Sequence, residues 1–250
     1  MELMYLLDNF HWSQLLQPQW YVENGGLWLL LLVVFAETGL FVGFFVPGDS
    51  LLFVAGIFAH KMENGDPGLA HQFLKLIGMG NINNEWVDLF TLVALISFVG
   101  ILGNAVGYWT GRKVGPAMFN WRDRFLFKKK YLYQAQEFYT KHGGLAIIGA
   151  RFLPFIRTFA PIVAGIVKMD RKKFHFFNVI GSIAWVFTMI FAGYFLQKWI
   201  LQQFGFDLKD HLEIIVIGIV LITTAPVIIK LLTSKKGPPG MPPSADNTLR

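Results

Sequence analysis

Long apolar runs separated by short polar segments make up most of this chain and predict helices that cross a membrane. The clearest runs are residues 89–111 and 176–197, which contain no charged side chain. Each reaches the roughly 20 residues that an α-helix needs to cross a hydrocarbon core about 30 Å thick. We expect further crossings at 27–44 and at 214–232, the latter with Lys230 extending its amine toward the interface. The pattern therefore predicts an all-α polytopic membrane protein.

Two other apolar segments are interrupted by helix-breaking residues, and we expect each to enter the membrane and return on the same side. One is a short helix at 50–59, directly after the first crossing, and the other is 144–167. Proline and glycine end a helix, and Asp or Ser often begins the next one. The interrupting residues are Pro47 and Gly48 in the first segment and Pro154 and Pro161 in the second. The expected re-entrant helical hairpins cover about 44–60 and 144–167.

The distribution of basic residues predicts the orientation in the membrane. Residues 112–142 carry eight Lys or Arg and residues 168–173 carry four, and the positive-inside rule places both segments in the cytoplasm. A complete crossing by 144–167 would separate them, so that segment is expected to dip in and return. The loop 60–85 then lies outside, and the hairpin at 44–60 enters from the opposite face. Both chain termini are expected in the cytoplasm.

A short internal repeat supports two opposed hairpins. The sequence Val-Ala-Gly-Ile occurs at 54–57 and again at 163–166. Each predicted hairpin also precedes a crossing that contains a Gly-Tyr pair, at 107–108 and at 193–194. Inverted repeats whose broken helices meet near the bilayer midplane are typical of transporters.

The remaining parts of the chain are expected to lie at or outside the membrane surface. Residues 1–23 are predicted to form an interfacial helix, and 24–232 the transmembrane domain. The basic, amphipathic segment 131–142 is predicted to lie on the cytoplasmic leaflet. Residues 233–250 are rich in Pro and Gly and are predicted to be a disordered cytoplasmic tail.

Composition agrees with a membrane protein and excludes several other classes. Hydrophobic residues make up 54% of the chain and charged residues 15%, whereas soluble domains carry roughly 25% charged residues. The net charge of +6 fits basic loops beside anionic headgroups, and without a nucleic-acid-binding motif we expect no nucleic-acid partner. The absence of cysteine, the scattered histidines and the lack of a nucleotide-binding motif predict no metal site and no cofactor.

Four ionisable residues lie inside the predicted apolar segments: Glu37, Asp49, Arg151 and Arg157. Each costs at least about 2.5 kcal/mol at the bilayer centre unless it is paired or faces water. A helix break at Pro154 would allow both guanidinium groups to converge, and their forked donors suit a phosphate group. The alternative is that the two arginines are structural counter-ions that lock the hairpins together.

The two acidic residues carry separate hypotheses. Glu37 lies in mid-crossing, far from any predicted helix end, and is the better candidate for a proton or cation site. Asp49 could fulfil the same role or could cap the helix that begins near Ser50.

A stripe of small residues follows the second crossing at four-residue spacing. Its members are Gly103, Gly107, Gly111 and Gly115. Such a face predicts close helix packing rather than ligand binding. The neighbouring Asn104 is expected to form an interhelical hydrogen bond.

Five motifs together resemble the DedA family of bacterial membrane proteins, which share the VTT domain with eukaryotic lipid scramblases. The motifs are FAETG at 35–39, FVPGDS at 45–50, GYWTGR at 107–112, ARFLPFIR at 150–157 and APIVAG at 160–165. The resemblance implies two opposed re-entrant hairpins in the bacterial inner membrane, in agreement with the charge pattern.

The resemblance also implies a function. The acidic pair of the family falls on Glu37 and Asp49, and its arginine pair falls on Arg151 and Arg157. It implies translocation of the carrier lipid undecaprenyl phosphate, or a related anionic phospholipid, with dependence on the proton or sodium motive force. Membrane lipids are then the expected partners, in particular an anionic polyisoprenyl phosphate, and a homo-oligomer is a further possibility.

Two alternatives to a lipid flippase remain open at this point. One is a proton- or sodium-coupled antiporter of small cations, in which the arginines are structural. The other is a non-transporting scaffold for envelope homeostasis or a lipid-modifying enzyme. We expect no enzyme, because the chain lacks a cysteine nucleophile, a Ser-His-Asp arrangement and a metal cluster.

Overall fold

The computed structural model describes residues 18–40, 48–59, 68–81, 84–120, 129–205, 207–208 and 218. Within these ranges the long regular elements are all α-helices, which confirms the all-α fold class for the described part of the chain. The helices are α2 (Pro18–Gly39), α3 (Gly48–Ala59), α4 (His71–Leu76), α5 (Glu85–Asn120), α6 (Lys129–His142), α7 (Leu145–Arg151), α8 (Pro154–Ile166) and α9 (Arg171–Phe204). The predicted crossing at 214–232 and the predicted tail at 233–250 lie outside the described residues, apart from residue 218, as does most of the N-terminal segment.

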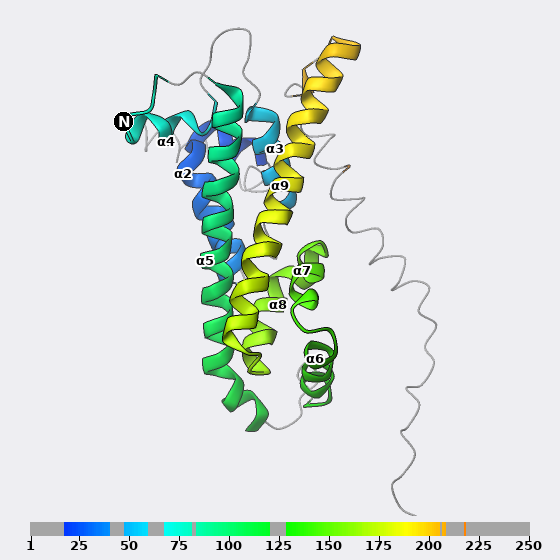
Figure 1. Ribbon diagram of the computed structural model, residues 1–250. Helices are drawn as coiled ribbons and strands as arrows, with labels where there is room; N and C mark the ends of the chain where they lie inside the picture. Colours follow the sequence, from blue (N-terminus) through cyan, green and yellow to red (C-terminus); the bar gives the residue numbers. More distant parts are fainter. Residues whose placement is uncertain are drawn as a thin grey trace, which may run out of the picture.

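Helices α5 and α9 are the two long elements and lie side by side in opposite directions (Figure 1). The segments Glu85–Gly115 and Arg171–Phe204 are long and apolar enough to cross a membrane. They contain the predicted crossings at 89–111 and 176–197. Helix α9 begins where the Asp170 side chain accepts a hydrogen bond from the Lys173 backbone N–H at 2.9 Å, as N-capping residues do.

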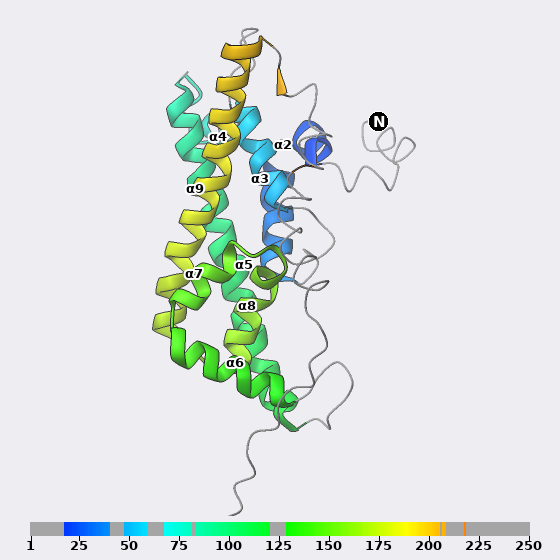
Figure 2. The ribbon, with the colours of Figure 1, turned by 90° about the vertical axis from the view of Figure 1, so that its right-hand side faces the viewer.

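The shorter helices gather at the two ends of this long pair. Helices α2 and α3 lie beside the upper half in Figures 1 and 2, and α6, α7 and α8 lie beside the lower half. Helix α6 coincides with the amphipathic helix predicted at 131–142 and lies across the lower end (Figure 2). The Tyr139 hydroxyl attaches it to α8 by donating to the Ala160 carbonyl at 3.0 Å.

The first predicted crossing is not a helix of membrane-spanning length. Helix α2 is interrupted at Gly26, whose φ of 55° and ψ of −147° are not helical and suit a residue without Cβ. The apolar arm that follows is only Gly26–Gly39, about 21 Å at 1.5 Å per residue. It therefore ends before residue 44, and residues 41–47, including Pro47, lie outside the described residues.

The segment predicted as an external loop at 60–85 contains a short helix, α4. Its Gln72 side chain accepts a hydrogen bond from the Leu27 backbone N–H at 3.3 Å. This contact attaches the loop to the start of the apolar arm of α2, where the break at Gly26 leaves backbone donors without helical partners.

The second broken segment has the predicted form of two helices with an interruption between them. Leu153 is extended, with φ of −111° and ψ of 107°, and Pro154 begins α8, because a residue before proline is disfavoured in the helical region. Pro161, in contrast, does not break α8. Pro161 lies against α5, where a Cβ added at Gly107 would be 3.6 Å from the Cβ of Pro161.

Glycines allow the backbones of α3 and α9 to touch. A Cβ at Gly56 of α3 would overlap the Ile190 carbonyl of α9, and a Cβ at Gly193 would overlap the Phe53 carbonyl of α3. Helix α3 is consequently enclosed, with every residue except Phe58 buried, as expected of a helix that is apolar all round.

The same reciprocal contact joins α8 to α5. A Cβ at Gly165 of α8 would overlap the Tyr108 carbonyl, and a Cβ at Gly111 of α5 would overlap the Ile162 carbonyl. In both helix–helix contacts, each glycine lies three residues after a carbonyl of its own helix, and that carbonyl is the one that the glycine of the other helix approaches. The structure thus relates α3 to α8 and α9 to α5.

This relation extends the internal repeat and corrects part of it. Gly56 and Gly165, from the two Val-Ala-Gly-Ile sequences, occupy equivalent positions. Gly193 is equivalent to Gly111, one helical turn beyond Gly107, so the two Gly-Tyr pairs are not equivalent.

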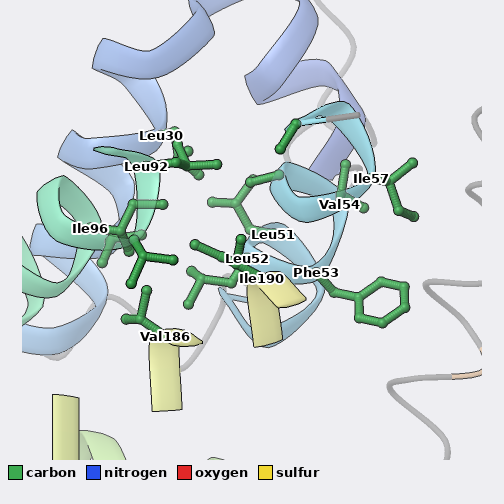
Figure 3. Close-up of a cluster of buried hydrophobic side chains, with 14 of the residues drawn as sticks. Leu30, Leu51, Leu52, Phe53, Val54, Ile57, Leu92, Ile96, Val186 and Ile190 are labelled. Carbon is green, nitrogen blue, oxygen red and sulfur yellow. The ribbon is translucent and has the colours of Figure 1, made fainter. Parts of the chain in front are cut away.

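A hydrophobic cluster joins the upper helices to both long helices (Figure 3). Leu30 of α2, Leu51 of α3, Ile96 of α5 and Ile190 of α9 are completely or almost completely buried in it. The outer faces of the long helices are apolar as well, with residues such as Phe98 exposed. This distribution fits contact with lipid rather than water.

Replacing Gly111 by Ala should destabilise the α5–α8 crossing, because the new methyl group has no space beside the Ile162 carbonyl. We expect a loss of about 1–3 kcal/mol in the free energy of unfolding, measured as a lower thermal midpoint of the protein in detergent. Gly100→Ala is the matched control, because a Cβ there has nothing within 4 Å. Equal thermal midpoints for the two variants would contradict the close contact between α5 and α8.

Candidate functional site

All four buried charged residues predicted from the sequence meet near the middle of the molecule. Glu37 comes from the end of α2, Asp49 from the first turn of α3, Arg151 from the end of α7 and Arg157 from the first turns of α8. Glu37 is 2% exposed, Asp49 9% and Arg151 6%, and the side chain of Arg157 is 10% exposed. These helices form two pairs, α2 with α3 and α7 with α8, and the inner ends of the two pairs bring the charges together.

Arg157 is shared by both carboxylates. Its Nη2 donates to Glu37 Oε1 and its Nη1 donates to Asp49 Oδ1. The Trp185 indole lies beneath it, with the guanidinium carbon 4.8 Å from the ring centre, and its Nε1 donates to the same Asp49 oxygen at 2.9 Å. A cation held between two anions and an aromatic face is well compensated for burial.

The position of Glu37 depends on Gly48. A Cβ at residue 48 would overlap the Glu37 carboxylate, so only glycine permits the first turn of α3 to approach it. Glu37 Oε2 is buried and has no hydrogen-bond partner among the described residues. Asp49 lies inside the first turn of α3, which begins at Gly48, so its carboxylate also benefits from the positive end of the helix dipole.

Arg151 is surrounded differently from Arg157. Among the described residues it has no carboxylate partner: its Nη2 donates to Asn178 Oδ1 at 2.8 Å, and its guanidinium carbon lies 5.8 Å from the Trp185 ring centre. It passes close to α9 at Gly181, where a Cβ would be 3.4 Å from Arg151 Cδ. Among the described residues, the site thus contains one cation that is paired with two carboxylates and one that is hydrogen-bonded only to an amide.

Asn178 connects three helices at this point. Its Oδ1 also accepts from Asn104 Nδ2 at 2.9 Å, and its Nδ2 donates to the Ile101 carbonyl at 3.1 Å. The interhelical hydrogen bond expected for Asn104 is therefore present and ends on the same oxygen that holds Arg151. A network of this kind fixes the positions of its members, because each buried polar group is expensive to leave unpaired.

A small cavity lies among these side chains. It is lined by Glu37, Thr38, Asn104, Arg151, Arg157, Thr158 and Trp185. The space open to the centre of a water molecule is about 10 Å³, which is room for roughly one water. A larger ligand would require the helix pairs to move apart.

The glycine stripe on α5 positions the elements that form the site. Gly103 lies against Thr38 of α2, Gly107 against Pro161 and Ile162 of α8, and Gly111 against the Ile162 carbonyl. Small residues allow such close approach of helices in lipid. The stripe thus positions α2 and α8 on one face of α5.

Sequence reasoning missed Trp185 and Asn178. Trp185 lies in the middle of the crossing predicted at 176–197, where Trp is unusual because it prefers the interface. Asn178 is the third residue of that crossing, where an amide inside an apolar run requires a partner. The central position of Trp185, and the amide side chain inside the apolar run at Asn178, were the signals that could have identified them. Among the described residues no group of three or more His, Cys, Asp or Glu is arranged to hold a metal ion.

Comparison with known proteins places the chain in a family. The family model of the VTT domain matches residues 46–195, a range that includes Asp49, Arg151 and Arg157. Protein DedA of Escherichia coli K12 is 35% identical over 245 residues, covering 94% of this chain and 97% of that protein.

More distant relatives are membrane proteins as well. An uncharacterized membrane protein of Mycobacterium leprae is 33% identical over 223 residues, 89% of this chain and 86% of that protein. The inner membrane protein YqjA of Escherichia coli K12 is 28% identical over 198 residues, 74% of this chain and 79% of that protein. No solved structure matches the chain. The family model and the extent of identity show that this chain belongs to the DedA family of membrane proteins, which carry the VTT domain.

Proposed function

We propose that this protein is a flippase that moves a lipid with an anionic phosphate headgroup across the bacterial inner membrane, without catalysing a chemical reaction. The observation that carries the proposal is the buried guanidinium of Arg151, which has no carboxylate partner among the described residues and lines the same small cavity as Arg157. A buried cation without a counter-ion is costly, and a phosphate oxygen would compensate it. The resemblance to the family makes undecaprenyl phosphate the first candidate.

The membrane placement that supports this proposal follows from the basic end of the molecule. The end that carries α6 and the start of α9 is rich in Lys and Arg, so the positive-inside rule assigns it to the cytoplasm. Helices α2 and α3 then form a hairpin from the outer face, and α7 and α8 form one from the inner face. The arm Gly26–Gly39 is the descending half of the outer hairpin, so residues 18–26 lie at the outer face rather than in the cytoplasm as expected from the sequence.

Binding of the phosphate would begin at Arg151. Its single described hydrogen bond, to Asn178, uses one of the five N–H donors of a guanidinium. The remaining N–H groups can donate to the phosphate of the headgroup, while the isoprenoid tail stays in the lipid outside the helices. Arg157 could join once a carboxylate is released, because its positive charge is already balanced by the two carboxylates that its Nη atoms contact.

Protonation of a carboxylate supplies that release. A proton on Glu37 or Asp49 removes one of the negative charges that attract Arg157 and weakens the contact between α8 and the outer hairpin. Glu37 Oε2, which has no hydrogen-bond partner among the described residues, is available for the proton. An ion drives such a change only if it binds the two conformations differently. In this proposal the contact between Arg157 and the carboxylates is present in one conformation and released in the other.

A second function is favoured by one observation. The positive charge of Arg157 is balanced by two carboxylates, as expected if the arginines are structural and the acids carry a proton or sodium ion. A cation antiporter of this kind would catalyse cation flux in proteoliposomes that contain no phosphate lipid, whereas the flippase would require that lipid.

Replacing Arg151 by Gln should weaken phosphate binding while leaving the Arg157 contacts in place. In proteoliposomes loaded with a polyisoprenyl phosphate, transfer to the outer leaflet can be followed by digestion with an added phosphatase. We expect the rate to fall roughly 10- to 100-fold, the value of one charge-assisted hydrogen bond. Lys141→Gln, an exposed base on α6, is the control, and a wild-type rate for Arg151→Gln would refute the phosphate role.

Replacing Asn178 by Leu should misplace Arg151 without removing its charge. We expect the same phosphatase assay to show about a tenfold loss of transport, together with a higher lipid concentration at half-maximal rate. Thr188→Val on α9, where an exposed hydroxyl donates only to its own helix, serves as the control. If both variants transport normally, Asn178 does not position Arg151 for binding.

Replacing Glu37 by Gln should uncouple transport from the pH gradient, because the side chain keeps its shape and can no longer exchange a proton. Wild-type protein is expected to transport faster when a gradient is imposed, and the variant to transport at one rate with and without it. A gradient response of normal size in the variant would remove Glu37 from the coupling step.

A further inference from the structure

A second cluster of cationic side chains lies on the surface of the molecule, separate from the central site. A hollow beside the lower ends of α5 and α9 has a volume of about 520 Å³, within the range of roughly 300–1,000 Å³ found for small-molecule sites. Its lining residues are Val106, Trp109, Thr110, Arg112, Lys113 and Arg171. Three of the six are basic and none is acidic.

Contacts within the protein hold two of these basic side chains in place. The Arg171 guanidinium carbon lies 4.5 Å from the centre of the Trp109 ring, a cation–π contact. Arg112 Nη1 donates to the Tyr108 hydroxyl at 2.8 Å and to the Met169 carbonyl at 3.3 Å. Because the same guanidinium nitrogen makes both bonds, the other donors of Arg112 remain for a ligand.

The hollow combines this charge with an apolar wall. Val106 is 38% exposed and Trp109 is 46% exposed. Both come before the basic residues Arg112 and Lys113 in α5. The acid next to the hollow, Asp170, uses its carboxylate to cap α9 through the Lys173 backbone N–H. Arg171 is the first residue of α9, so the positive end of the helix dipole adds to the charge.

We propose that this hollow is a binding site for the phosphate of an anionic phospholipid of the cytoplasmic leaflet. Arg112, Lys113 and Arg171 bind the headgroup phosphate, and Val106 and Trp109 contact the first carbons of the acyl chains. The proposal goes beyond the transport site, because Arg151 and Arg157 are buried between the hairpins and do not line this hollow. A lipid bound here bridges the ends of α5 and α9 and stays in place while the central site works.

The test measures lipid binding rather than transport, so it is independent of the proposed function. The full-length protein in a neutral detergent is titrated with phosphatidylglycerol or phosphatidylcholine, and bound lipid is counted by native mass spectrometry. We expect one phosphatidylglycerol to bind preferentially, and the double variant Lys113→Gln, Arg171→Gln to bind it roughly tenfold or more weakly. The double variant Lys141→Gln, Lys172→Gln is the control, because it removes the same charge outside the hollow.

Two outcomes would overturn the proposal. Equal loss of phosphatidylglycerol binding in the two double variants would show a general effect of charge. Displacement of the lipid by inorganic phosphate at millimolar concentration would show a site for free phosphate, without a role for the apolar wall. A single variant, Trp109→Ala, tests that wall directly: weaker lipid binding with unchanged thermal stability supports the proposal, and unchanged lipid binding contradicts it.

Discussion

A buried guanidinium group shared by two carboxylates is the contact on which the arrangement of this protein depends. Arg157 joins α8 to Glu37 of α2 and Asp49 of α3, and so connects two helix pairs that lie at opposite ends of the molecule. Each of these charges would be expensive to bury alone. The relative position of the two pairs therefore depends on the ionisation of the carboxylates, which links the stability of the fold to its chemistry.

Close backbone contact is what brings such short helices to the centre. Helix α3 has 12 residues and α8 has 13, and neither is long enough to cross a bilayer. In lipid, helices associate chiefly through van der Waals packing and hydrogen bonds. The reciprocal glycine contacts on α9 and α5 supply that packing at both ends of the molecule. Since the two crossings are equivalent, the first turns of both short helices meet in the middle, where the charges lie.

The two arginines of the ARFLPFIR motif have unequal surroundings, although the sequence presents them as a pair. Arg157 follows the break and contacts the carboxylates, whereas Arg151 precedes it and rests on α9, hydrogen-bonded to Asn178. Both contact Trp185, a residue that sequence reasoning did not select. The inequality separates a charge that is paired with two carboxylates from a charge that has no carboxylate partner among the described residues.

The sequence by itself determined the helices α5, α6 and α9, the break before Pro154, the four buried charges and the family. Apolar periodicity, proline and charge are local properties of the chain, so each of these could be recognised in a single segment. Only the tertiary structure decided that α2 stops at Gly39, that Arg157 rather than Arg151 contacts the acids, and that Gly111 is the counterpart of Gly193. These features depend on the distances between segments that lie far apart in the chain. No local pattern records such distances, because they result from how all the helices pack at once.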